Sequence, residues 1–233
     1  MTLFNAQDVK ALRKELSELM TGPVTVDLYL RKEGRILVPG REPCETCETA
    51  LQIATEVAAL SDAITLNVHD VDAEAGPAPA RLPALFLSGA ARGQVRYFGL
   101  PSGYEVGTLL RDVVYVSSGN AGLSPDTRDF LAALTGPVHL QVFVTPTCPY
   151  CPQAAAIAHA FAVESDKVTA DVVEISEFPD MARAYRVQGV PKTVIERPAV
   201  AISAGGRGQA MPIELVGAQP EAALLDALRR AVA

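Results

Sequence analysis

The segment Phe143-Val-Thr-Pro-Thr-Cys-Pro-Tyr-Cys-Pro152 gives the clearest indication of how this chain folds. An apolar strand is expected directly before it, over residues 138–144, and a helix directly after it, over residues 151–164. Two cysteines separated by two residues therefore lie where a strand gives way to a helix. In a chain with this order of elements, such a pair is typical of redox-active thiols.

The chain repeats this arrangement. A shift of 104 positions places the pair Cys44/Cys47 on the pair Cys148/Cys151. The first half carries extra residues ahead of its motif, between 31 and 43, and their glycines and prolines indicate a loop. Repetition at this scale indicates two copies of one structural unit.

Both halves show the same order of expected elements, which defines an α/β fold. The sequence predicts two tandem units, each a mixed four-stranded sheet flanked by helices. A polar, glycine-containing stretch over 117–122 separates the units into 1–118, with the first motif, and 119–233, with the second. The expected helices cover 6–20, 47–60, 104–116, 126–134, 151–164 and 220–232, and the expected strands cover 24–30, 64–70, 83–87, 94–98, 138–144, 168–175, 191–196 and 211–216.

Composition limits the possible functions. The chain of 233 residues has a net charge of −7 and a pI near 5.0, which argues against nucleic-acid binding. It contains no apolar run of the length that a membrane helix needs, and residues 1–20 lack the pattern of a signal peptide. We therefore expect a cytoplasmic protein with no membrane association. All four cysteines belong to the two pairs, as expected of a protein that cycles disulfides in a reducing compartment.

These motifs resemble those of the glutaredoxin-like protein disulfide oxidoreductases of thermophilic archaea and bacteria, a tandem thioredoxin-fold family. The resemblance rests on the 143–152 stretch, on Gly189-Val-Pro-Lys-Thr193 and on Arg96-Tyr-Phe-Gly-Leu-Pro-Ser-Gly-Tyr-Glu105. It covers nearly the whole chain and implies two thioredoxin-fold units. The chain is also similar to the tandem N-terminal module of flavin-dependent alkyl hydroperoxide reductases, which usually keeps one cysteine pair.

The resemblance implies a function and partners. It implies reduction of disulfides in protein substrates, with isomerisation as a further activity, a thioredoxin reductase-like flavoprotein as electron donor, and no cofactor beyond the redox-active disulfides. A dedicated electron donor to a peroxiredoxin is the alternative. The resemblance also implies a cis peptide at Val190-Pro191, where the Val190 backbone would pair with the substrate. Leu82-Pro83 is the corresponding position in the first unit, and Pro149 and Tyr150 complete the expected substrate contacts.

Cys148 and Cys151 have the properties that disulfide exchange requires. Exchange needs a thiolate, an accessible sulfur and a resolving thiol nearby. A cysteine at a helix start has its thiolate stabilised by free backbone N–H groups and the helix dipole, and Pro149 suits the first helical position. Cys148 is thus the expected nucleophile and Cys151 the resolving thiol. A structural zinc site formed by both pairs is the alternative, but zinc pairs usually lie much closer in sequence.

Cys44 and Cys47 occupy a more acidic setting, flanked by Glu42, Glu45 and Glu48. Like charge disfavours a thiolate, so the pKa of Cys44 is expected to exceed that of Cys148. Both cysteines are predicted to be catalytic. An auxiliary pair that passes electrons to the second pair or to a reductase remains the alternative.

Glu174 is the candidate for a buried acid that moves the proton of the resolving thiol. The strand position that carries an aspartate in thioredoxins is Val142 here, and Glu174 on the neighbouring strand could replace it. An ordinary carboxylate at a strand end is the alternative. The three histidines show no ligand spacing, so no metal site is predicted. The glycine-rich stretch 205–208 is expected to be a turn rather than a phosphate site.

Overall fold

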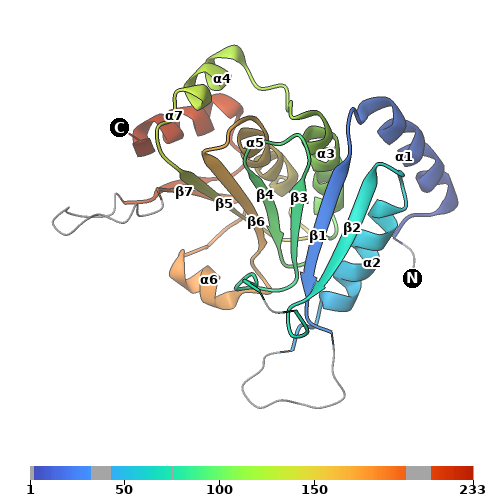
Figure 1. The fold of residues 1–233 in the computed structure, drawn as a ribbon. Coiled ribbons are helices and arrows are strands. Elements are labelled where there is room, and N and C mark those ends of the chain that lie inside the picture. Colours follow the sequence, from blue (N-terminus) through green and yellow to red (C-terminus); the bar gives the residue numbers. More distant parts are fainter. Residues whose placement is uncertain (1–2, 33–42, 75, 198–210, 233) are drawn as a thin grey trace.

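A computed structural model describes residues 3–32, 43–74, 76–197 and 211–232. Its centre is one continuous sheet in the order β2-β1-β3-β4-β6-β5-β7-β8 (Figure 1). The first half of the chain contributes β1 to β4 and the second half β5 to β8. Each half is thus a mixed four-stranded sheet with flanking helices, and the predicted fold class is confirmed.

The elements of the first half lie close to their expected positions. They are α1 (Ala6–Leu19), β1 (Val24–Leu30), α2 (Cys47–Ala58), β2 (Ile64–Asp70), β3 (Ala84–Ser88), β4 (Gln94–Phe98) and α3 (Glu105–Ser118). The elements of the second half are α4 (Pro125–Ala132), β5 (Val138–Val144), α5 (Cys151–Glu164), β6 (Val168–Glu174), α6 (Pro179–Ala184), β7 (Lys192–Glu196), β8 (Ile213–Val216) and α7 (Glu221–Val232).

Several element ends differ from the expectation by one or two residues, and three of the differences are informative. Strands β3 and β7 begin one residue after Pro83 and Pro191, because a proline has no N–H to donate to a sheet. Strand β8 begins at Ile213 rather than at residue 211. The short helix α6 lies in a segment that the sequence indicates only as a connection. Most of the predicted loop over 31–43, and the predicted turn over 205–208, lie outside the described residues.

Strand directions place both motifs at the same edge of the sheet. Strands β1 and β2 are parallel, β4 is parallel to β6, and β5 is parallel to β6. Because β3 is antiparallel to both β1 and β4, strand β1 also runs in the direction of β4, β5 and β6. The motifs follow β1 and β5, four strand spacings apart, which corresponds to about 19 Å.

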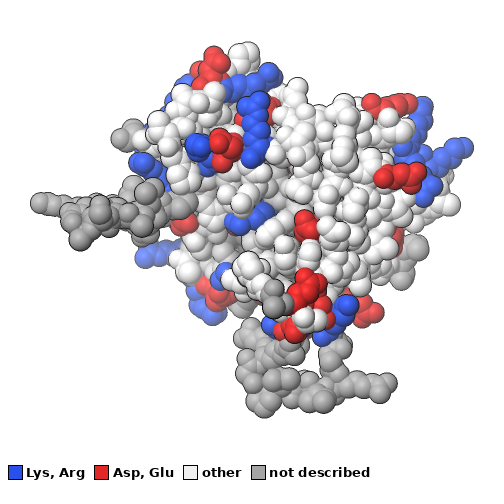
Figure 2. All heavy atoms as spheres, in the orientation of Figure 1, with Lys and Arg blue, Asp and Glu red and all other residues white. Residues whose placement is uncertain are grey.

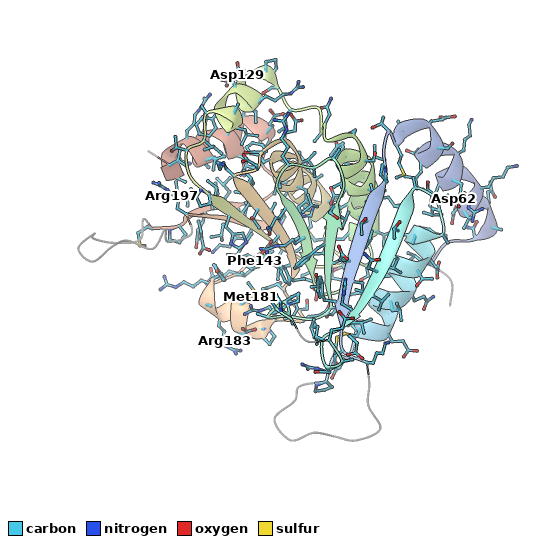
Figure 3. The ribbon with its side chains drawn as sticks, in the orientation of Figure 1. Asp62, Asp129, Phe143, Met181, Arg183 and Arg197 are labelled. Carbon is cyan, nitrogen blue, oxygen red and sulfur yellow. A yellow bond between two sulfur atoms is a disulfide. The ribbon has the colours of Figure 1, made fainter. Side chains whose placement is uncertain are left out.

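The sheet is covered unequally on its two faces. Helices α2, α3 and α5 pack on it, and in β1 every second residue is buried, as expected of a strand with one covered face. Strand β5 is buried almost throughout, because α6 covers its other face. Phe143 of β5 lies beside Met181 of α6 in this second layer (Figure 3). Additional cover around β5 makes the strand before the second motif the more deeply buried of the two.

The two halves join through β4 and β6. Arg96 forms a two-pronged ion pair with Asp171, with Nε–Oδ1 and Nη2–Oδ2 distances of 2.7 and 2.9 Å. Gly93 approaches the second half so closely that a Cβ there would lie 2.1 Å from the carbonyl oxygen of Val168. Helix α3 ends at Ser118 with Gly119 in the left-handed region as its cap. The division into units at 118/119 stays a prediction, since the halves share one sheet.

Candidate redox site

The second motif forms a disulfide at the start of α5. Cys148 and Cys151 are bonded, with their Cα atoms 5.4 Å apart, and Cys151 is the first residue of the helix. The bond therefore fixes the Cys148 sulfur at the N-terminus of α5, where unpaired backbone N–H groups favour a thiolate. Pro149 lies just before the helix rather than at its first position, whereas Pro152 occupies the first turn.

The two cysteines of this pair differ modestly in burial. Cys148 is 8% exposed and Cys151 is fully buried, while the intervening Tyr150 is 67% exposed. The backbone N–H of Cys148 donates to the carbonyl of Thr145 at 3.1 Å, which closes the turn after β5. The first cysteine of this pair is thus the less buried of the two, as expected if Cys148 is the attacking thiol and Cys151 the resolving thiol.

The first motif repeats this geometry. Cys44 and Cys47 are bonded with the same Cα separation of 5.4 Å, and α2 begins at Cys47. Cys44 is again the more exposed cysteine. Glu45 and Glu48 lie on the surface beside the pair, and Glu42 lies outside the described residues. The acidic setting inferred from the sequence is therefore present at the two glutamates that the structure describes.

Both predicted proline positions are cis. The Leu82-Pro83 and Val190-Pro191 peptide bonds are cis, which confirms the geometry implied by the resemblance at Val190 and extends it to the first half. Val190 and Leu82 are half-buried at the ends of their loops. Contact with the substrate by these residues, and by Pro149 and Tyr150, stays a prediction.

Glu174 is buried at the end of β6, opposite Val144 of β5. Its carboxylate accepts the backbone N–H groups of Ser176 and Glu177 at 3.2 and 3.0 Å. These bonds close the turn after β6, so the residue has a structural task, and its part in proton transfer stays a prediction.

The structure contains a buried polar cluster between α3, β4 and α5. No pattern in the sequence predicts this cluster. Asp112 accepts hydrogen bonds from the Tyr97 hydroxyl and from Nδ1 of His159, the latter at 2.6 Å, and Nε2 of His159 lies 3.2 Å from the carbonyl of Arg96. Burial, the largest effect, lowers the pKa of His159, but the charge and hydrogen bond of Asp112 outweigh it and raise this pKa above its usual value. This cluster connects the two halves.

Glu105 is a further candidate functional residue that the sequence does not indicate. It is the first residue of α3, is 2% exposed, and within the described part of the chain neither carboxylate oxygen has a hydrogen-bond partner. Burial raises the pKa of Glu105 to about 7. With Val144 and Glu174 it lines a small pocket. A raised pKa in such a place is a recognised mark of a proton-transferring group.

The start of α3 packs directly on the loop that leads to Cys148. The N–H of Tyr104 donates to the carbonyl of Pro146 at 3.1 Å. A Cβ at Gly103, which has φ of 60°, would lie 2.2 Å from the same oxygen, so this contact requires glycine. Glu105, two residues after Gly103, therefore begins a helix whose first turn is anchored on the loop that leads to the second motif.

The pairing of the cysteines argues against one shared zinc site. The two motifs stand at strands about 19 Å apart, whereas the ligands of one zinc ion surround it at about 2.3 Å. Within the ranges that the structure describes, no group of three or more His, Cys, Asp or Glu side chains is arranged to hold a metal ion.

The surface shows no concentration of one charge on the face drawn in Figure 2. Acidic and basic side chains are interspersed there, and much of the surface carries neither. Among the described residues, no helix is long and apolar enough to cross a membrane.

Comparisons with known proteins agree with this geometry. The family model described as a thioredoxin domain matches residues 138–203. A probable thioredoxin of Methanothermobacter marburgensis is 32% identical over 71 residues, which cover 30% of this chain and 84% of that protein. The chain spans about a quarter to a third of the length of the curated alkyl hydroperoxide reductase relatives that it matches.

Two solved structures match almost the whole chain. A protein disulfide oxidoreductase from Aeropyrum pernix superposes with a TM-score of 0.76 and 27% identity, covering 98% of this chain and 93% of that one. The alkylhydroperoxide reductase component AhpF from Enterococcus faecalis gives a TM-score of 0.76 and 25% identity, covering 97% and 99%.

Two Cys-x-x-Cys disulfides, each at the start of a helix on a tandem sheet, define a disulfide oxidoreductase of the thioredoxin fold. The chain belongs to the thioredoxin family, in its tandem form.

Proposed function

We propose that this chain reduces disulfides in protein substrates, and isomerises them where a substrate disulfide can re-form elsewhere, with Cys148 as the nucleophile. The observation that carries the proposal is the arrangement of the second pair, which forms a disulfide at the start of α5 with Cys151 fully buried and Cys148 slightly exposed. Cys44 and Cys47 form a second catalytic pair of the same geometry. The units 1–118 and 119–233 each supply one pair.

The reaction follows thiol–disulfide exchange. The Cys148 thiolate attacks one sulfur of the substrate disulfide, which forms a mixed disulfide and releases the other sulfur as a thiolate. Cys151 then loses its proton and attacks the Cys148 sulfur, which restores the disulfide and releases the second substrate sulfur. Two electrons pass from the cysteine pair to the substrate, and both substrate sulfurs take up protons.

A buried acid is proposed to take the proton of Cys151. Glu105 is the stronger candidate, because its pKa of about 7 allows it to accept a proton near neutral pH and its helix start packs on the Cys148 loop. Glu174 remains the second candidate, because it lines the same pocket.

Partners follow from the relatives and from the site. We propose that a thioredoxin reductase-like flavoprotein reduces the disulfides, and that Val190, Pro191, Leu82, Pro83, Pro149 and Tyr150 contact the substrate. A second candidate function, electron donation to a peroxiredoxin, is favoured by the similarity to alkyl hydroperoxide reductases. We place the chain in the cytoplasm, since all four cysteines lie in exchangeable pairs of the kind that reducing compartments retain.

Single cysteine variants test the proposed roles. Cys151→Ser should accumulate a mixed disulfide between Cys148 and a disulfide-bonded substrate such as insulin, because the resolving thiol is absent. Cys148→Ser should form none at the second motif, and Cys44→Ser serves as the matched control in the other pair. Equal trapping in the Cys148→Ser and Cys151→Ser variants, read by non-reducing electrophoresis and mass spectrometry, would contradict the assignment.

A separate pair of variants distinguishes the two acids. If Glu105 accepts the proton, Glu105→Gln should slow the release of the mixed disulfide most at neutral pH and little at alkaline pH, where Cys151 ionises without help. Glu174→Gln should then leave this pH profile unchanged. The reverse result would assign proton transfer to Glu174.

A further inference from the structure

Glu177 reaches from the second half of the chain to the first redox motif. It lies between β6 and α6, yet its Oε2 accepts the hydroxyl of Thr46 at 2.5 Å. Thr46 stands between Cys44 and Cys47 and is the N-cap residue of α2. The other oxygen, Oε1, accepts the backbone N–H of Leu100 at 2.6 Å. One carboxylate thus joins three separate segments at the first disulfide.

The backbone around Glu177 is shaped to hold it there. Its N–H donates to Oε2 of Glu174 at 3.0 Å, which fixes the turn after β6. Gly99, with φ of 82°, faces the same turn, and a Cβ on it would come within 2.9 Å of both the Glu177 carboxylate and the Glu174 side chain. The position of the carboxylate is therefore determined by the fold rather than by a freely rotating side chain.

The charge of Glu177 is not offset locally. None of the ion pairs within the described residues includes it, and its nearest titratable neighbour is another acid, Glu174. Burial, the largest effect, raises the pKa of Glu177, while the hydrogen bonds from Thr46 and Leu100 lower it and the charge of Glu174 adds a smaller increase; the net pKa is raised. On the side of α2, the exposed Glu45 and Glu48 flank Thr46. The first motif therefore receives a carboxylate from the other half of the chain in addition to its own.

Among the residues that the structure describes, the second motif has no counterpart of Glu177. Over the described residues, no carboxylate is hydrogen-bonded to Pro149 or Tyr150, the residues between its cysteines. The local sequences alone do not reveal this difference, because Glu177 and Thr46 lie 131 positions apart.

We propose that Glu177 is a positioning residue for the first redox pair, through which the second half of the chain holds the Cys44–Cys47 turn and disfavours the Cys44 thiolate. The inference rests on the proposed function, because it explains why two similar pairs would not act alike. To attack a disulfide, Cys44 must first give its proton to solvent, and a fixed negative charge beside Thr46 makes the resulting thiolate less stable. In the described structure, no carboxylate is held in the corresponding place beside Cys148, so its thiolate is not disfavoured in this way.

The test is alkylation of the reduced, full-length chain with iodoacetamide at pH 7.5, with each cysteine read separately by peptide mass spectrometry. Glu177→Gln keeps the shape and the hydrogen-bonding capacity of the side chain but removes its charge. We expect Cys44 to react about three- to tenfold faster in this variant, as a thiolate freed from one nearby charge should, while the Cys148 rate stays at its wild-type value. Asp180→Asn removes an acid three residues on, where it pairs with Arg81 on the surface, and should change neither rate.

Two outcomes would overturn the inference: an unchanged Cys44 rate in Glu177→Gln, or an equal rise in the Cys44 and Cys148 rates. Glu177→Leu, which removes charge and hydrogen bonds together, should accelerate Cys44 in the same direction and serves if the first variant folds poorly. Insulin reduction by the same preparations separates this inference from the proposed function. Active wild-type protein with an unchanged Cys44 rate in Glu177→Gln refutes only the role of Glu177, whereas inactive wild-type protein refutes the proposed function.

Discussion

Replacement of Glu105 by glutamine should make the protein more stable at alkaline pH. The carboxyl is buried at the start of α3 without a hydrogen-bond partner in the described structure, and burial raises its pKa from 4.5 to about 7. The folded protein therefore holds a proton on Glu105 at pH values where the unfolded chain has already released it. An acid with a raised folded-state pKa makes stability fall as pH rises through the window between the two values.

The size of the effect follows from the two pKa values. A difference of about 2.5 units, at about 1.4 kcal/mol per unit, corresponds to a loss of about 3 kcal/mol in the free energy of unfolding once the pH exceeds 7. The glutamine variant cannot ionise and avoids this loss. Its advantage over wild type should be close to zero at the acidic end of the window and grow to about 3 kcal/mol at pH 8.

Guanidinium unfolding of the oxidised proteins at several pH values from 4.5 to 8.5 measures this advantage. Keeping both disulfides intact preserves the same unfolded-state constraints in both proteins. His159 also titrates in both proteins, and its charge lowers the pKa of Glu105, so the difference between the proteins reports Glu105 together with this interaction. A stability difference that does not change with pH would contradict this prediction, because it would show that Glu105 ionises at its usual pH despite its burial.

Two further predictions concern the join between the halves. Asp112→Asn should lower the free energy of unfolding by about 3 kcal/mol, because it removes the charge that His159 and Tyr97 face in a fully buried site. A melting temperature equal to that of wild type would contradict this predicted loss. Gly93→Ala should lower stability by at least about 2 kcal/mol, since its Cβ would meet the carbonyl of Val168 at 2.1 Å. An unchanged thermal unfolding transition in Gly93→Ala would show that β4 and β6 separate more easily than their pairing suggests.

Much of the fold could be predicted because its signals are local and occur twice. The bounds of β1, β2, β4 and β5 agree with the expected residues, since each strand is a short, mostly apolar or alternating segment next to clear turn residues. The cysteine pairs and the prolines at 83 and 191 could be placed for the same reason. Helix α6 was missed because six residues between two strands give too short a pattern to distinguish from a connection.

The cross-chain parts of the site could not be predicted. The repeat indicates two units but says nothing about which strand of one pairs with which strand of the other, and β4 beside β6 follows only from the structure. The sequence presents His159 as an ordinary packed histidine, and nothing in it marks Asp112, 47 positions away, as its partner. Glu105 likewise shows its importance only through burial, a property that arises when α3 packs against the loop of the other half.

We propose that the second pair is the principal site of disulfide reduction, and an insulin-reduction assay with paired cysteine variants provides a decisive test of this claim. The assay compares wild type with the double variants Cys148→Ser/Cys151→Ser and Cys44→Ser/Cys47→Ser, driven by dithiothreitol so that no specific reductase is required. Loss of the second pair should abolish the acceleration of insulin reduction, whereas loss of the first pair should leave most of it. Full activity without Cys148 and Cys151, or its loss only when Cys44 and Cys47 are replaced, would contradict the claim.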